Sequence, residues 1–262
     1  MSGGVLRSRA GLSAIVAAVV AMLLVAGFAA WYFVFRDVAT PTTVGEAVTN
    51  FRGDTDRTPG PSPVPVGVYV YATKGFEHTD ALTGATHRYP PRSTITVTKD
   101  PCGVRMRWDV LEGRSTTWTF CIDAGRWVMT TQDERHTFFG VTQGTTYQCS
   151  DVSFRLPGDE PSRDMPVTCT TSGATENETQ RTVGREPMRV AGKAVSTVHV
   201  RQATSLSGNI RGASTYDIWL DRETGVPVRI SMVSHTTNGS PVGDVHYDEI
   251  VTLRLLSATP RR

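Results

Sequence analysis

The 262-residue sequence lacks a surplus of charge of either sign, since 27 Lys and Arg residues stand against 25 Asp and Glu residues and the net charge is +2. Three of the arginines, Arg7, Arg9 and Arg36, precede Asp37, and no acidic residue does. The 27 basic residues less these three leave 24 in residues 37–262, against 25 acids, a net charge of −1. Nucleic-acid binding requires a concentrated basic surface, so we expect no nucleic-acid partner.

Recognisable catalytic motifs are also absent. The sequence contains no HExxH, GxSxG or SxxK motif and no Gly-rich phosphate loop. Among the scattered histidines, His246 with Asp248 and Glu249 forms a candidate metal or acid/base cluster. Alternation along a strand places His246 and Asp248 on one face and Glu249 on the other, which splits the cluster. We therefore expect no enzymatic activity, no metal and no cofactor.

One long apolar run is present near the amino terminus. Residues 11–35 contain no charged side chain, and a helix of about 25 residues spans about 37 Å, enough for a bilayer core of about 30 Å. The alternative, a cleaved signal peptide, has an apolar region of only about 7–15 residues. Arg7 and Arg9 precede the run, so the positive-inside rule predicts a cytoplasmic amino terminus.

These features predict a single-pass protein of the plasma (cytoplasmic) membrane. Residues 1–10 form a cytoplasmic tail, 11–35 a transmembrane helix, 36–65 a Pro/Thr-rich linker and 66–257 an extracytoplasmic domain. A weak helical turn is compatible with residues 44–50 of the linker.

Cysteine is scarce, with four residues that all lie beyond the predicted anchor: Cys102, Cys121, Cys149 and Cys169. Their spacing fits no zinc motif, and an even number in an exported domain predicts two disulfides. Four cysteines allow three pairings. We favour Cys102–Cys121 and Cys149–Cys169, because each closes a local loop of about 20 residues.

Residues 66–257 alternate between apolar and polar side chains, which predicts antiparallel β-strands. A three-residue loop at 111–113 pairs Val110 with Arg114 and places Met106 opposite Trp118. His199 falls on the polar side of its strand, where a solvated side chain is expected. Residues 157–193, rich in Pro and Gly, predict a long loop. The expected fold class is mainly β, a curved antiparallel sheet that forms a half-barrel or a sandwich from both halves of the domain.

One string predicts a strand, a turn and a strand: Asp221 opens the turn and Gly225 takes a positive φ. It resembles the W-x-D-x-x-T-G-x-P-x-R hairpin common in the periplasmic lipoprotein-carrier and LppX-like group, and the resemblance covers roughly residues 183–256. The matching residues are Trp219, Asp221, Thr224, Gly225, Pro227 and Arg229. The resemblance implies a half-barrel whose concave face holds acyl chains. The first half is similar to uncharacterised single-pass membrane-anchored exported proteins of actinobacteria.

Aromatic residues supply the candidate ligand-lining set: Trp108, Trp118, Phe120, Trp127 and Phe139. Core and ligand pocket use the same residue types, so these side chains fit either role. The leading hypothesis is a membrane-tethered, non-enzymatic binding module for a lipid or another amphiphile. The alternative is a structural or accessory subunit of a cell-envelope complex, with an envelope protein as its partner.

Overall fold

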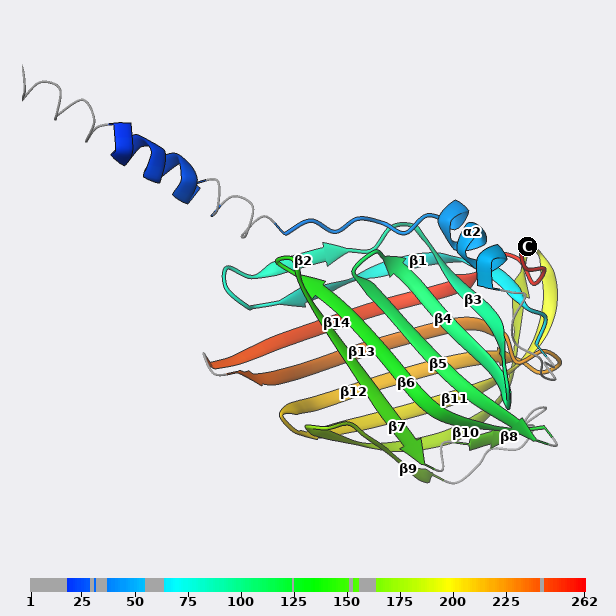
Figure 1. Ribbon diagram of the computed structural model, residues 1–262. Helices are drawn as coiled ribbons and strands as arrows, with labels where there is room; N and C mark the ends of the chain where they lie inside the picture. Colours follow the sequence, from blue (N-terminus) through cyan, green and yellow to red (C-terminus); the bar gives the residue numbers. More distant parts are fainter. Residues whose placement is uncertain are drawn as a thin grey trace, which may run out of the picture. The chain divides into compact units, whose positions relative to one another are not determined.

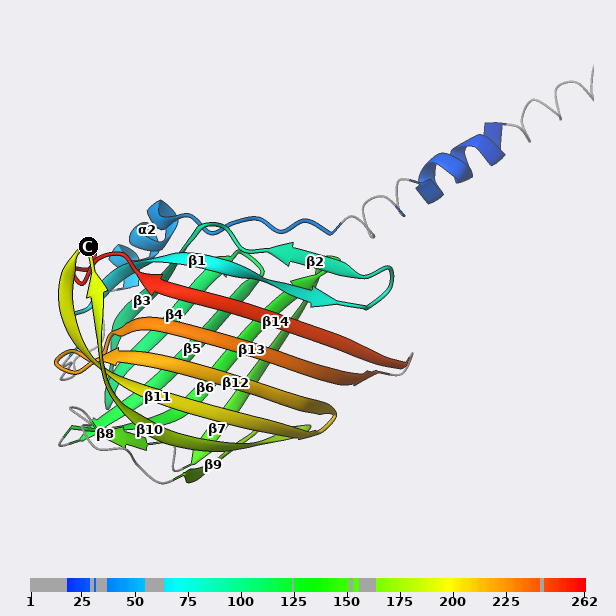
Figure 2. The ribbon, with the colours of Figure 1, turned by 180° about the vertical axis from the view of Figure 1, so that it is seen from behind.

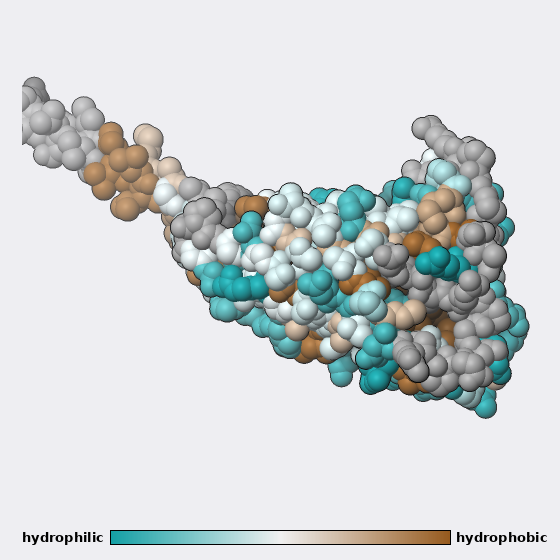
Figure 3. Space-filling view, turned by 90° about the horizontal axis from the view of Figure 1, so that it is seen from below, coloured by the Kyte–Doolittle hydropathy of each residue, from teal (hydrophilic) through white to brown (hydrophobic). Residues whose placement is uncertain are grey.

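The computed structural model describes residues 18–28, 31, 37–54, 64–123, 125–150, 153–155, 164–240 and 243–262. Residues 18–28 are helical, with exposed and mostly hydrophobic side chains (Figure 3). Within the described ranges, no helix is both long and apolar enough to cross a membrane. The predicted tail, 1–10, and positions 11–17, 29–30 and 32–35 of the predicted anchor lie outside the described residues.

Helix α2 (Val44–Asp54) lies in the segment predicted as a linker, at the expected helical turn. Its start is fixed by a reciprocal capping box, in which the Thr43 N–H donates to Glu46 Oε2 (2.8 Å) and the Glu46 N–H donates to Thr43 Oγ1 (3.2 Å). Ala47 and Phe51 are buried against Val68 of the following domain. The helix therefore packs on the outside of the β-domain (Figure 1).

The rest of the described chain forms strands that belong to one antiparallel sheet. Their bounds are β1 Gly67–Thr79, β2 Ala85–Arg88, β3 Arg92–Asp100, β4 Gly103–Leu111, β5 Arg114–Asp123, β6 Arg126–Phe138, β7 Val141–Ser150, β8 Ser153–Arg155, β9 Met165–Thr170, β10 Ala174–Val190, β11 Lys193–Gly208, β12 Ile210–Asp221, β13 Pro227–Ser240 and β14 Gly243–Leu255. From β3 to β14 each strand pairs with the next one along the chain, except that β7 pairs with β9 and the short strand β8 pairs with β6. At the start of the sheet, β1 pairs with both β2 and β3.

The sheet is a closed twelve-strand barrel, because β14 also pairs with β1. The first half of β1 pairs with β3 along its other edge, so the ring comprises β1, β3 to β7 and β9 to β14 (Figures 1 and 2). The prediction of a mainly antiparallel β-fold built from both halves is confirmed. The expected half-barrel or sandwich is wrong, because β1 pairs with β14 and closes the ring of strands.

The closure could not be predicted from the sequence, because the second half of β1 lacks hydrophobic alternation. Its inward positions are Thr73, Glu77 and Thr79, all buried although polar, so the hydrophobic alternation stops while the strand continues. Gly75, with a φ of 158°, lies opposite Val251 of β14. A Cβ built on Gly75 would lie 2.1 Å from the backbone oxygen of Ile250. The close approach of the closing strands therefore requires glycine at this position.

The predicted register between β4 and β5 is confirmed for Met106, which lies opposite Trp118. The predicted Val110–Arg114 pair is wrong, because a bulge after Asp109 makes Leu111 the partner of Arg114 across a two-residue turn. The bulge lets both Val110 and Leu111 be buried. It also leaves the side chain of Arg114 buried.

Both favoured disulfides are present, Cys102–Cys121 and Cys149–Cys169. Cys102 lies in the turn before β4 rather than in the strand, which removes the constraint that strand alternation places on its side chain. Cys149 and Cys169 are direct cross-strand partners on β7 and β9.

The loop predicted at 157–193 is wrong for the residues that the structure describes there, since 165–170 and 174–190 form β9 and β10. Hydrophobic alternation fails in β10 because its inward positions, Glu176, Glu178 and Gln180, are polar. Gly184, one of the glycines that suggested a loop, lies instead at a β-bulge within β10, where its φ is 142°.

We predict that Gly75→Ala destabilises the barrel by roughly 2–5 kcal/mol, the sum of a positive-φ penalty of about 1–2 kcal/mol and an overpacking penalty of about 1–3 kcal/mol. Guanidinium unfolding measures the change. Gly45→Ala, in the first turn of α2, is the matched control, because the nearest contact of an added Cβ outside the helix backbone is Thr43 Oγ1 at 3.9 Å. This variant is expected to retain wild-type stability or gain a little. Equal stability of the two variants would contradict the role of Gly75 in closure.

Candidate functional site

Part of the barrel interior is filled by a continuous apolar core. Its central members come from β1, β3, β4, β13 and β14, among them Tyr71, Ile95, Val104 and Leu253. Side chains of the β10–β11 hairpin, Met188, Val190 and Val195, pack against the same core. A ligand therefore finds no room in this part of the interior.

Beside the core the interior contains a cavity that seven strands line, β4, β5, β6 and β10 to β13. Its volume is about 70 Å³, inside a larger atom-free space of about 790 Å³ that is partly open to solvent. The apolar lining residues are Met106, Trp118, Phe120, Trp127, Met129, Val200, Tyr216, Ile218, Leu220, Pro227 and Ile230. The polar ones are Gln132, Glu176, Glu178 and Gln202. Apolar walls with a few polar groups are typical of small-molecule sites.

Three of the five candidate aromatic residues meet at this cavity: Trp118, Phe120 and Trp127. The rings of Phe120 and Trp127 pack edge to face with centroids 5.7 Å apart, and the indole N–H of Trp118 donates to Gln132 Oε1 (3.1 Å). Both contacts hold the rings in place, as a preformed wall requires. That these rings contact a ligand stays a prediction.

The other two candidates lie elsewhere. Trp108 belongs to the apolar core, where its indole N–H donates to Ser93 Oγ (3.0 Å) and its ring meets Tyr89 edge to face. Phe139 lies in the turn after β6 with a φ of 52°. Neither residue lines the cavity.

Two buried carboxyl groups face the cavity from β10. Glu176 and Glu178 are each 7% exposed, and alternation places both on the inward face of the strand. Burial raises the pKa of Glu176 to about 8, with further contributions from the charges of Glu134 and Glu178. Burial also raises the pKa of Glu178 to about 7. Within the described part of the chain, Glu178 Oε1 has no hydrogen-bond partner.

A second buried polar cluster lies where the barrel closes. Glu77 of β1 and Glu249 of β14 are direct cross-strand partners, an arrangement that is repulsive for two like charges. Arg114 compensates: its Nη2 lies 2.7 Å from Glu249 Oε2 and its Nε lies 3.8 Å from Glu77 Oε2. The Tyr247 hydroxyl lies 3.0 Å from Glu77 Oε2 and 2.9 Å from Glu249 Oε2, so the two carboxylates share its single proton.

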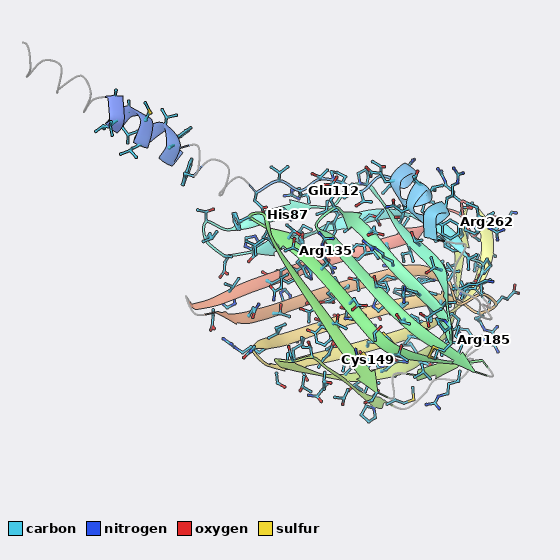
Figure 4. The ribbon with its side chains drawn as sticks, in the orientation of Figure 1. His87, Glu112, Arg135, Cys149, Arg185 and Arg262 are labelled. Carbon is cyan, nitrogen blue, oxygen red and sulfur yellow. A yellow bond between two sulfur atoms is a disulfide. The ribbon has the colours of Figure 1, made fainter. Side chains whose placement is uncertain are left out.

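Histidines complete this closing network. His87 Nδ1 lies 2.9 Å from Glu77 Oε1, and His136 Nδ1 lies 3.1 Å from Glu77 Oε2. Burial alone raises the pKa of Glu77, but the hydrogen bonds from His136 and His87 and the charge of Arg114 together lower it to about 2. The network therefore holds an ionised Glu77 in the interior. It ties β1, β2, β5, β6 and β14 together, and Figure 4 labels His87 on β2.

The predicted split of the His246 cluster is confirmed. Asp248 pairs on the outside with His235, whose Nδ1 lies 2.6 Å from Asp248 Oδ1, whereas Glu249 is buried in the closing network. Among the described residues, no group of three or more His, Cys, Asp and Glu side chains is arranged to hold a metal ion.

The predicted solvated role of His199 is wrong. The residue is only 8% exposed, because its ring stacks on Trp219 with centroids 4.3 Å apart and its Nε2 lies 2.6 Å from Asp217 Oδ1. The guanidinium of Arg229 lies 4.6 Å from the centre of the Trp219 ring. This arrangement is a cation–π contact between cross-strand partners.

The hairpin turn after Trp219 forms as its sequence predicts. Asp221 Oδ1 accepts the backbone N–H groups of Glu223 and Thr224, and Gly225 has a φ of 72°. Local turn chemistry and one cation–π pair therefore account for most of the motif.

No family model, curated protein or solved structure matches the chain. The fold and cavity define the chain as a twelve-strand antiparallel β-barrel domain with two disulfides and an apolar interior space. The resemblance to the lipoprotein-carrier group is supported only as far as antiparallel β-structure.

We predict that Glu178→Gln stabilises the protein at pH 8 and leaves its stability unchanged near pH 4. The pKa of Glu178 is about 7 in the folded protein against 4.5 for a free glutamate. The protonated carboxyl is therefore accommodated below about pH 4.5, and ionisation of the buried group disfavours folding increasingly as the pH rises to about 7. The gain from glutamine is of the order of 3 kcal/mol above that range. Urea unfolding at both pH values measures it. Glu112→Gln, on the exposed β4–β5 turn labelled in Figure 4, serves as the control, and a gain independent of pH would refute the raised pKa.

A second prediction concerns the closing network. Arg114→Met leaves two buried carboxylates facing each other without their cation, so we expect a loss of about 3–5 kcal/mol. Arg107→Met removes a partly exposed ion pair with Asp109 on β4 and is expected to cost less, about 1 kcal/mol. Guanidinium unfolding of both variants gives the comparison, and similar losses would show that the network is not important for closure.

Proposed function

We propose that the barrel binds one slender amphiphile in its interior cavity and catalyses no reaction on it. The observation that carries this proposal is the cavity itself, an apolar space walled by Trp118, Phe120 and Trp127 beside a well-packed core. A cavity of about 70 Å³ exceeds the roughly 10–15 Å³ that one water molecule needs. Its walls favour an alkyl chain over water.

The proposed location follows from the disulfides and the apolar run. Two disulfides are typical of an oxidising compartment, which supports an extracytoplasmic domain. An anchor at residues 11–35 would hold this domain at the outer face of the plasma membrane, beside a supply of lipid. Binding is preferred to the role of an accessory subunit of an envelope complex, because docking to another protein does not require an interior cavity.

We predict that the full-length protein, held in an amphipathic polymer without detergent, binds 1-decanol with one-to-one stoichiometry in isothermal titration calorimetry. Ile218→Trp places a bulky indole ring in the cavity that Ile218 lines. Decanol binding is therefore expected to weaken at least about tenfold. Ile250→Trp makes the same change on an exposed position of β14 and is expected to bind like the wild type.

Two results would count against the proposal. Undetectable binding of decanol by the wild type removes its basis. Equal affinity of the Ile218→Trp and Ile250→Trp variants, with both shown to be folded by circular dichroism, would place the bound alcohol outside the cavity.

A further inference from the structure

The polar groups of the cavity are unequally satisfied. Gln132 accepts the Trp118 N–H and donates to Glu134 Oε1 (3.1 Å), and Gln202 donates to Gln180 Oε1 (3.2 Å). These two lining amides thus have protein partners. Glu178 Oε1, on a residue 93% buried, has none among the described residues, although it lines the same space.

The surroundings of the two cavity carboxyls supply no compensating cation. In the described ranges, neither Glu176 nor Glu178 takes part in an ion pair. Apart from Glu178, the titratable groups that interact with Glu176 are Glu134 of β6, Tyr147 of β7 and Tyr216 of β12, none of them a cation. A positive charge in this apolar cavity would compensate the two buried carboxylates on its wall.

We propose that the ligand is a cationic amphiphile, whose alkyl chain lies against the aromatic wall and whose ammonium group pairs with Glu176 and Glu178. This inference rests on the proposed function and specifies its ligand class. An ammonium group offers hydrogen-bond donors and a positive charge to both carboxylates, and such charge-assisted hydrogen bonds are about twice as strong as neutral ones. An anionic head group is repelled there, and a neutral one leaves the ionised carboxylates unpaired.

The proposal fixes a pH dependence. In the free protein the pKa values of about 8 for Glu176 and about 7 for Glu178 mean that protons occupy much of the site at neutral pH. A bound cation favours the ionised form of both groups, so binding releases protons and the affinity rises with pH up to about 8. A neutral acceptor, such as an ester or alcohol oxygen, accepts from the protonated carboxyls and has the opposite dependence.

The test compares three ten-carbon probes, decylammonium, 1-decanol and decanoate, by calorimetry on the full-length protein at pH 6 and pH 8.5. We expect decylammonium to bind at least about tenfold more tightly than decanol at pH 8.5 and to lose most of that preference at pH 6. In the Glu176→Gln/Glu178→Gln variant the preference for the amine over decanol at pH 8.5 is expected to disappear. Glu112→Gln, an exposed acid changed in the same way, keeps the preference.

The outcomes separate the ligand class from the proposed function. Equal binding of amine and alcohol at pH 8.5, tightest binding of decanoate, or a preference that survives in the double variant overturns the cationic ligand and leaves an amphiphile-binding barrel. Binding of none of the three probes by the wild type overturns both proposals.

Discussion

The pairing of β1 with β14 is the constraint on which the rest of the structure depends. It turns a sheet with two open edges into a barrel, and it sets Glu77 directly opposite Glu249 in the interior. Two adjacent buried carboxylates repel each other strongly in a medium of low polarity. Closure is therefore stable only with a buried cation between them, and Arg114 is that cation.

The position of Arg114 depends in turn on a local irregularity. The bulge after Asp109 pairs Arg114 with Leu111 at the end of β5, and its side chain is 2% exposed while bonded to both oxygens of Glu249. A bulge near a sheet end redirects a side chain at little cost in ladder hydrogen bonds. A feature of one hairpin thus permits contact between strands at opposite ends of the sequence.

Local features of this fold could be predicted from the sequence, and long-range ones could not. The Met106–Trp118 register, both disulfides and the turn from Asp221 to Gly225 depend on residues close in the chain, where alternation and turn chemistry are informative. Closure depends on residues about 170 positions apart, Glu77 and Glu249, and no periodicity reports such a pair.

The candidate site divides in the same way. Trp118, Phe120 and Trp127 could be selected because aromatic residues alternate on predicted strands. Glu176 and Glu178 could not, because inward acids in β10 look like the exposed face of a strand or like a loop. In a strand whose buried face is polar, side chains still alternate between the two faces as in any other strand. Only the packing of neighbouring strands shows which face is buried.

The buried carboxyl groups of the closing network, Glu77 and Glu249, can be compared with those of the cavity, Glu176 and Glu178. At the closing network each oxygen of Glu77 and of Glu249 has a hydrogen-bond partner, and a guanidinium lies beside both carboxylates. Glu178 is also buried, but it faces the cavity, and its Oε1 has no hydrogen-bond partner in the described chain. An unpaired buried carboxyl lowers the stability of the folded state at neutral pH. Because burial without a compensating cation raises the pKa of both Glu176 and Glu178, the proposed ligand gives these two acids a role that the surrounding fold does not supply.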